Sequence, residues 1–156
     1  MAGTKITPDN PLALEHQVCF GLAVAARTVI ALYRPVLEPL GLTHPQYLVM
    51  LALWQAEPVS VKDLSGMLQL EPATLSPLLK RLEAAGLVRR DRSKDDERAL
   101  AVALTEKGRA LREQALTVPP TIVERLGLEV DELMDLHARL TTVIAAATKA
   151  GQQTGK

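Results

Sequence analysis

The amino-acid sequence predicts a mainly α-helical chain with one small β-hairpin. Two observations support this fold class. Most apolar residues recur at helical spacing, in segments that begin after Ser or Thr and stop at Gly or Pro. Residues 88–92 and 99–104, by contrast, have the pattern of two short strands on either side of a charged turn at 93–97.

The composition limits the class of protein. The chain has 156 residues, 47% hydrophobic and 23% charged, which suits about one folded domain. A single cysteine excludes an intrachain disulfide and a zinc knuckle, and the three histidines have no metal-ligand spacing. Residues 1–11 lack a signal-peptide pattern, and no apolar run is expected to reach the length of a membrane span. We therefore expect a cytoplasmic protein that is not an enzyme, with no cofactor, no metal site and no membrane contact.

The N-terminal part is expected to hold a loose segment and two helices. Residues 1–11 are polar and should form a flexible arm. Residues 12–32 should form one long helix, bent or broken near the prolines that follow it. The next helix begins at Thr43, which forms a capping box with Gln46.

A helix-turn-helix is predicted next. Ser60 caps a short helix, with Asp63 three residues later. A longer helix follows from about residue 72 and stops at Gly86, and Pro77 should deform its first turns. With the basic hairpin directly after it, the unit at residues 43–104 has the order of a winged helix-turn-helix.

Two further helices complete the prediction. Thr105 caps a helix that runs to about Val118, and Pro119–Pro120 break it. A final helix is expected over residues 129–150, where apolar residues recur at helical spacing.

The charge distribution favours nucleic acid as a partner. The net charge is zero, but residues 80–94 contain six basic and two acidic residues, a balance of +4 that leaves −4 on the remainder. A local basic block on a neutral body is what a DNA-binding element needs. The alternative is a plain helical domain whose hairpin carries a charged, solvated face.

The second helix of a helix-turn-helix enters the major groove with its N-terminal residues at base edges. Small hydroxyl side chains can contact bases and phosphates there, and arginine at a wing tip recognises the width of the minor groove. The predicted DNA-binding residues are Ala73, Thr74, Ser76, Pro77, Lys80, Arg81, Arg90, Arg92 and Arg98.

The segment "DDERALAVALTEKG" resembles the signature of the MarR family of winged-helix repressors, with Asp96 and Arg98 in the wing and "LTEKG" after the strand. The flanking helices also match that family in number and order. The resemblance implies an obligate homodimer on a pseudo-palindromic, double-stranded operator. It further implies that residues 12–42 and 105–150 form the helical dimerisation region.

The lone cysteine, Cys19, lies in an apolar helical segment, where cysteine is usually a small hydrophobic residue. Tyr33 follows 14 residues later, close to four helical turns, so both lie on one face about 21 Å apart along the axis. Two copies of this helix crossing antiparallel near Ala25–Ala26 would bring Cys19 of one subunit beside Tyr33 of the other.

The start of the second helix supplies two further groups able to bond a sulfur atom, His44 and Tyr47. A phenol hydrogen bond or a nearby imidazolium stabilises the thiolate, which is the reactive form. Because there is no second cysteine, a sulfenic acid at Cys19 would have no resolving partner in the chain.

The segment "VCFGLAVAARTVIALYRPVLEPLGLTHPQYLVMLALW" closely resembles the organic hydroperoxide resistance regulators, a subfamily of the MarR family. The matching residues are Cys19, Tyr33, Pro45, Gln46, Tyr47 and Trp54. The resemblance implies that Cys19 is the peroxide sensor and Tyr33 its partner from the other subunit. His44 departs from the pattern, which has a second sensing tyrosine there; it lies either near the sulfur or toward solvent.

The implied mechanism starts with the reduced dimer on its operator. An organic hydroperoxide oxidises Cys19 to sulfenic acid, a low-molecular-weight thiol caps it as a mixed disulfide, and the enlarged group forces the dimer off DNA. Three alternatives remain: a MarR-type repressor induced by a small aromatic ligand without a redox step, a thiol peroxidase, and a purely structural dimerisation module.

Overall fold

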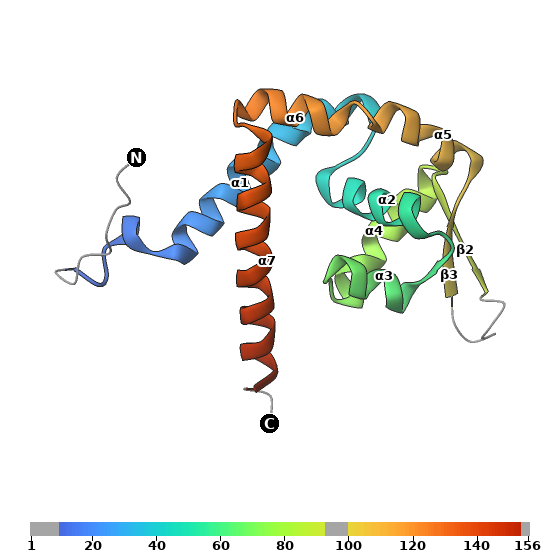
Figure 1. Cartoon of the computed structure of the whole chain (residues 1–156). Helices are drawn as coiled ribbons and strands as arrows, with labels where there is room; N and C mark the ends of the chain where they lie inside the picture. The colour runs from blue at the N-terminus through green and yellow to red at the C-terminus, as the bar shows by residue number, and fades with distance from the viewer. Residues whose placement is uncertain (1–9, 93–99, 154–156) are drawn as a thin grey trace. The chain divides into compact units, whose positions relative to one another are not determined.

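The computed structural model describes residues 10–92 and 100–153 and confirms the predicted fold class. It is mainly helical, with a three-stranded antiparallel sheet in the order β1-β3-β2 (Figure 1). The chain divides into two compact units, residues 1–118 and residues 119–156. In chain order the elements are η1 (Leu14–His16), α1 (Val18–Leu37), η2 (Glu38–Leu40), α2 (His44–Ala56), β1 (Val59–Ser60), α3 (Val61–Leu68), α4 (Pro72–Ala84), β2 (Val88–Arg92), β3 (Leu100–Leu104), α5 (Glu106–Ala115), α6 (Val118–Leu126) and α7 (Val130–Gln153).

The first long helix has other bounds than the sequence predicts. A short 3-10 turn, η1, precedes it, and Gln17 is extended with its side-chain amide donating to the carbonyls of Pro11 and Ala13. The helix α1 therefore starts at Val18. It continues through Pro35, which has no N–H and therefore leaves one hydrogen bond of the helix unmade without ending it.

The helix α1 and the turn after it form a longer apolar stretch than was expected from the sequence. The stretch Val18–Leu40 is long and apolar enough to cross a membrane by length and composition, so the expectation that no run reaches that length was wrong. Arg27 and Arg34 lie within it, and almost none of it is buried inside this chain.

Three predicted helix caps are confirmed. Thr43 and Gln46 form the capping box of α2: the Gln46 N–H donates to Thr43 Oγ1 at 3.4 Å, and the Thr43 N–H donates to Gln46 Oε1 at 2.9 Å. Ser60 Oγ accepts from the N–H of Asp63 at 3.0 Å, and Thr105 Oγ1 accepts from the N–H of Gly108 at 3.1 Å. Each bond satisfies a donor that the first helical turn leaves unpaired.

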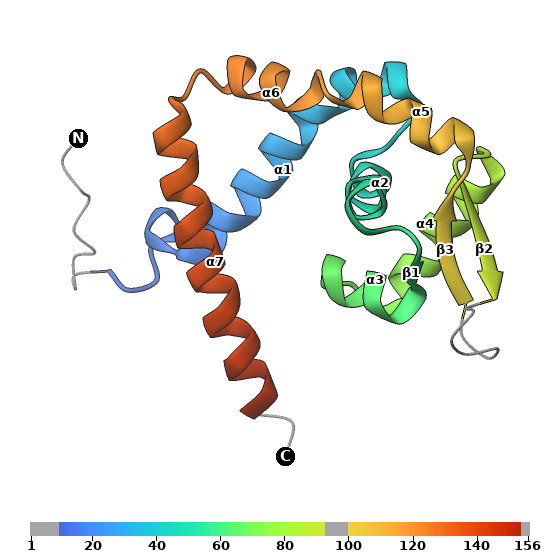
Figure 2. The same ribbon diagram turned by 45° about the vertical axis from the view of Figure 1, so that its right-hand side comes forward.

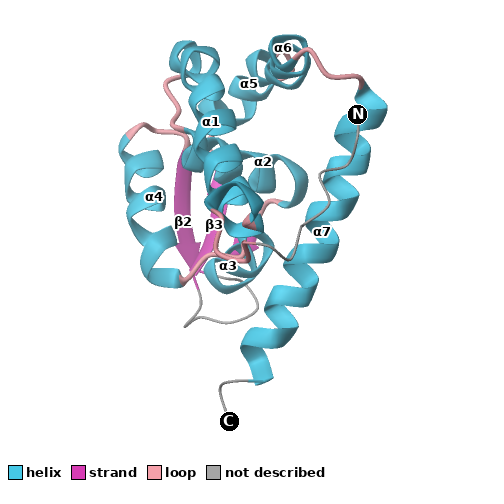
Figure 3. Cartoon of the chain, turned by 90° about the vertical axis from the view of Figure 1, so that its left-hand side faces the viewer, coloured by secondary structure: helices cyan, strands magenta, loops and turns pink. Residues whose placement is uncertain are grey.

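The sheet packs against the helices of the winged unit, with α4 along the β2 side (Figures 2 and 3). Val88 pairs with Leu104 and Arg90 with Val102, so the predicted hairpin is confirmed where the structure describes it. The short strand β1 was not predicted; it adds to β3, with Val59 opposite Val102. Leu100 shares one face of β3 with the buried Val102 and Leu104, but at the end of the strand its side chain is 45% exposed.

The turn predicted at 93–97, the wing tip with Arg98, and most of the arm at 1–11 lie outside the described residues. Pro77 does not interrupt α4, which runs unbroken from Pro72 to Ala84.

The segment after α5 corrects another prediction. The helix capped by Thr105 ends at Ala115 rather than near Val118, and Pro119–Pro120 lie in the first turn of a further helix, α6. Prolines are tolerated there because the first N–H groups of a helix have no intrahelical partner. The final helix, α7, begins and ends close to its predicted limits.

The junction between β3 and α5, residues 104–109, ties three elements together. The Trp54 indole N–H of α2 donates to the Gly108 carbonyl at 2.9 Å. The Glu57 carboxylate, just after α2, accepts from the Leu104 N–H at 2.5 Å and pairs with Arg109 at 2.6 Å. From the same junction Thr105 Oγ1 donates to the carbonyl of Gly86, just after α4.

Candidate DNA-reading surface and sensing site

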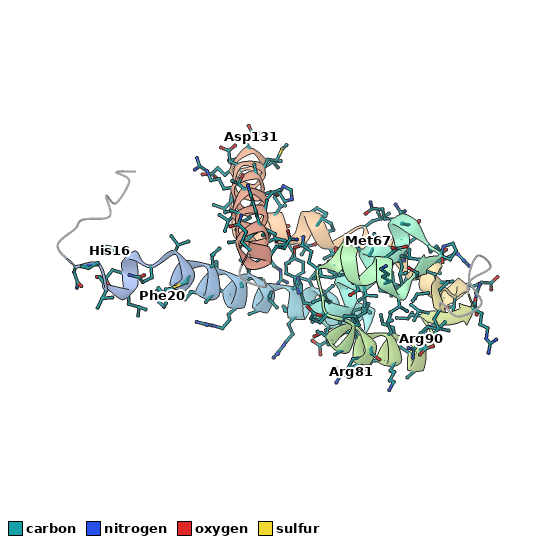
Figure 4. The ribbon with its side chains drawn as sticks, turned by 90° about the horizontal axis from the view of Figure 1, so that it is seen from below. His16, Phe20, Met67, Arg81, Arg90 and Asp131 are labelled. Carbon is teal, nitrogen blue, oxygen red and sulfur yellow. The ribbon has the colours of Figure 1, made fainter. Side chains whose placement is uncertain are left out.

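The helix α4 presents the face expected of a recognition helix. Its buried side carries Leu75, Leu78, Leu79 and Leu82, which pack into the core. The opposite side is exposed and holds most of the predicted DNA-binding residues: Ala73, Thr74, Pro77, Lys80 and Arg81. Ser76 is only half-exposed. Figure 4 shows Arg81 directed away from the body of the helix.

The bases of the hairpin differ in what they contact. Arg90 does not stand free: its guanidinium binds the Glu83 carboxylate of α4 at 2.7 Å. Arg89 pairs with Asp91 of its own strand at 2.7 Å. Arg92 is exposed and forms no ion pair with any described residue, and the predicted role of Arg98 lies outside the described residues.

The Glu83–Arg90 contact also sets the protonation of both groups. The hydrogen bond from Arg90 holds the pKa of Glu83 below its usual range, and the same bond raises the pKa of Arg90. Both groups are therefore charged at neutral pH, and the pair adds no net charge to the basic block.

The predicted sensing residues fall in two places. Cys19 is the second residue of α1 and its side chain is exposed. Tyr33 lies near the other end of the same helix, so the two are separated by about 21 Å of helical rise. One α1 helix alone cannot bring the thiol to the phenol.

Tyr33, His44 and Tyr47 form one cluster within the chain, here called the aromatic cluster. The Tyr33 and His44 ring centroids are 4.9 Å apart, with the planes inclined by 68°. The Tyr33 and Tyr47 centroids are 6.0 Å apart, with the planes inclined by 40°. The end of α1 and the first turn of α2 thus bring together three of the four predicted sensing residues.

Burial sets the protonation of the aromatic cluster. It lowers the pKa of His44 and raises the pKa of Tyr33. The pKa of Tyr47 is raised by burial and then by the nearby Tyr33. At neutral pH the imidazole is therefore neutral and both phenols keep their protons, so the cluster offers neutral donors rather than the imidazolium considered from the sequence.

A cavity of about 840 Å³ lies beside the aromatic cluster, between α1 and the start of α2. Its lining is apolar except for a few groups, among them Arg27, Arg34, Glu38 and His44. Sequence reasoning missed the two arginines, although their seven-residue spacing places them on one face of a helix. Among the described residues, no group of three or more His, Cys, Asp or Glu side chains is placed to hold a metal ion.

Comparison with known proteins gives consistent results. The family model of the SarA/Rot transcriptional regulators matches residues 31–114. The chain is 40% identical over 133 residues to the organic hydroperoxide resistance transcriptional regulator of Bacillus subtilis (strain 168), a match that covers 85% of this chain and 90% of that protein.

Two solved structures also resemble this chain. Reduced AbfR bound to DNA, AbfR being a protein of Staphylococcus epidermidis, is 31% identical with a TM-score of 0.75, covering 86% of this chain and 94% of that one. CouR from Rhodococcus jostii RHA1, solved with p-coumaroyl-CoA, is 25% identical with a TM-score of 0.73, covering 85% and 94%.

Proposed function

The chain belongs to the MarR family of winged-helix transcriptional regulators, in the group that includes the organic hydroperoxide resistance regulators, and from this premise we propose that it is a peroxide-sensing repressor. In this proposal a cytoplasmic homodimer binds operator DNA while Cys19 is reduced, and leaves the DNA when an organic hydroperoxide oxidises Cys19. The observation that carries the proposal is the aromatic cluster at one end of α1, with an exposed lone thiol at the other.

The DNA half of the proposal relies on α4 and the hairpin. The exposed face of α4 offers a hydroxyl group at Thr74, apolar carbon at Ala73 and Pro77, and positive charge at Lys80 and Arg81. Such groups suit base edges and phosphates of the major groove. Arg92 on β2, which is exposed and forms no ion pair with the residues that the structure describes, would add a further phosphate contact.

A homodimer would cover the apolar side chains that a single chain leaves exposed. The helices α1 and α7 each expose large apolar side chains along their length, and burying such surface is the dominant favourable term in association. The residues concerned are Val18, Phe20, Leu22 and Ile30 on α1, and Val130, Met134, Leu136, Val143 and Ile144 on α7.

The sensing half of the proposal needs two subunits. If two α1 helices cross antiparallel near Ala25–Ala26, Cys19 of one subunit reaches the aromatic cluster of the other. The small side chains of Gly21, Ala25 and Ala26 would permit that close approach, and no atom of the chain lies within 4 Å of a Cβ built on Gly21. The phenol of Tyr33 and the neutral imidazole of His44 would then donate hydrogen bonds to the thiolate and favour it over the thiol.

The chemical step is a two-electron oxidation of sulfur. The Cys19 thiolate attacks the terminal oxygen of the hydroperoxide, the O–O bond breaks, and the alkoxide leaves as an alcohol after taking a proton. The product is a sulfenic acid on Cys19. A low-molecular-weight thiol then attacks the sulfenic sulfur, a mixed disulfide forms, and the oxygen leaves as water.

Release from DNA follows from packing. A sulfenic acid or a mixed disulfide is larger and more polar than a thiol, and a close-packed seam between helices cannot accept it without rearrangement. A dimer must match two half-sites about one helical turn of DNA apart, so a small change in the spacing of the two α4 helices is enough to lose the operator.

The test is a DNA gel-shift on the protein's own upstream DNA, with wild type and Cys19→Ser, before and after an organic hydroperoxide with a small thiol. Release of the wild type with retention of Cys19→Ser would support the proposal. Equal behaviour of the two proteins after oxidant would contradict it.

A second candidate function is a repressor induced by an anionic ligand with an apolar body. The cavity beside the aromatic cluster favours it, because Arg27 and Arg34 line an otherwise largely apolar space. CouR, a relative, has been solved with p-coumaroyl-CoA. In that case Cys19→Ser would leave induction intact, whereas Arg27→Ala combined with Arg34→Ala would remove it.

A thiol peroxidase is the remaining alternative from another class. Its mark would be hydroperoxide consumption beyond one equivalent per subunit in the presence of added thiol. A peroxide sensor, by contrast, consumes one equivalent of hydroperoxide per subunit and reacts again only after its oxidised cysteine has been reduced.

A further inference from the structure

The contact between Glu83 and Arg90 joins the recognition helix to the wing. Glu83 lies in the last turn of α4 and Arg90 at the middle of β2, and their charged groups are 2.7 Å apart. The two side chains are only 31% and 22% exposed, so solvent screens the pair less than a fully exposed one. The neighbouring pair Arg89–Asp91 is 53% exposed on both sides and stays within one strand.

The register of the sheet explains why Arg90 meets α4. Alternate side chains of a strand point to opposite faces, so Val88, Arg90 and Arg92 share one face of β2. Val88 on that face is buried, and Arg90 lies opposite the buried Val102 of β3. Figure 4 shows Arg90 close to the end of α4. Arg90 is therefore held between the strand and the helix by an acid of that helix.

An acidic residue at the edge of a DNA-binding surface repels phosphate, so an unpaired Glu83 carboxylate would weaken DNA binding. The guanidinium of Arg90 neutralises the Glu83 carboxylate, and the same ion pair holds the hairpin against α4. Three bases of the block, Lys80, Arg81 and Arg92, form no ion pair within the part of the chain that the structure describes, and they are available for DNA.

We propose that Glu83 is a positioning residue for operator binding: it holds Arg90, so that α4 and the β2–β3 hairpin meet DNA at a fixed angle. This inference rests on the proposed function, since it requires a sequence-specific DNA complex. It assigns Arg90 an internal role in place of the direct DNA contact expected from the sequence. A rigid pair of elements loses less conformational freedom on binding than two loosely joined ones.

The experiment measures operator affinity of the full-length reduced protein by fluorescence anisotropy at several salt concentrations. Glu83→Gln and Arg90→Gln are each expected to weaken binding about fivefold, with the salt dependence unchanged because no phosphate contact is removed. The exchange variant Glu83→Arg with Arg90→Glu should recover affinity to within about twofold. Asp91→Asn, which breaks the exposed pair within β2, is the matched control and should not weaken binding.

Two outcomes would overturn the inference. If Arg90 contacts phosphate directly, Arg90→Gln lowers the salt slope by about one and the exchange variant does not recover. If Glu83 only repels DNA, Glu83→Gln binds as tightly as wild type or more tightly. Glu83→Gln preserves size and shape, so it decides the question even where the exchange variant fails to fold. Failure of the wild type to bind the operator would instead contradict the proposed function itself.

Discussion

The Tyr33 ring and the His44 imidazole meet edge to face, with their centroids 4.9 Å apart. This contact joins the last turns of α1 to the first turn of α2. Tyr47, about one helical turn after His44, also faces Tyr33, with the ring centroids 6.0 Å apart. The aromatic cluster therefore packs the end of α1 directly against the start of α2.

The lowered pKa of His44 predicts a stability effect in acid. Burial makes the folded protein bind this proton less readily than the unfolded chain, so stability falls as the pH drops through the ordinary histidine pKa of 6.5. His44→Gln should remove that part of the pH dependence. Thermal midpoints of both proteins between pH 8 and pH 5 check this; parallel curves would contradict it.

Gly108 should not tolerate a side chain. A Cβ at this position would lie 2.1 Å from the carbonyl oxygen of Leu87, and a backbone atom cannot move aside cheaply. Gly108→Ala should lower the free energy of unfolding by about 2–3 kcal/mol. The control is Gly66→Ala in α3, which meets open space and should raise it by about 0.5–1 kcal/mol. Urea unfolding measures both, and equal effects would contradict the prediction.

The end of α2 should depend on its two side-chain anchors to different degrees. Trp54→Phe removes the hydrogen bond to the Gly108 carbonyl and should lower the free energy of unfolding by about 1 kcal/mol. Glu57→Ala leaves the Leu104 N–H without its acceptor and removes the partner of Arg109. It should therefore lower the free energy of unfolding by more, about 1–3 kcal/mol. Urea unfolding followed by circular dichroism gives the order; a harmless Glu57→Ala would show that water replaces the carboxylate.

The exposed bases of α4 should act through phosphates. Arg81→Ala is expected to weaken binding to operator and to unrelated DNA by similar factors, and to lower the salt slope by about one. Arg112→Ala, an exposed base on α5, is the control and should leave both unchanged. Loss confined to the operator would mean that Arg81 contacts a base edge.

Local signals in the sequence predicted the parts of the fold that depend on near neighbours. Thr43 with Gln46, Ser60 and Thr105 each cap a helix through bonds within three residues, so the sequence alone locates them. Pro119–Pro120 were expected only to end a helix, but they lie in the first turn of α6, because proline can begin one helix as readily as it ends another. The strand β1 is two residues long, too short for any alternation to show.

Contacts between distant residues could not be predicted in this way. Glu57 and Arg109 are 52 residues apart, and no local pattern pairs them. Glu83 and Arg90 are only seven residues apart, but they belong to different elements, and no pattern in the sequence shows that the end of α4 packs beside the middle of β2. The sequence identified the members of the aromatic cluster, but it did not show that they contact one another within one chain, because that contact depends on how α1 packs against α2.

Cys19 and Tyr33 sit at opposite ends of one helix, and this separation has a genetic consequence. In the proposed dimer each site takes its thiol from one gene copy's product and its phenol from the other's. A cell carrying one allele without Cys19 and another without Tyr33 would thus assemble mixed dimers with one intact site and one doubly defective site. Two alleles that are each blind to peroxide would together regain a response, which no arrangement contained in a single chain allows.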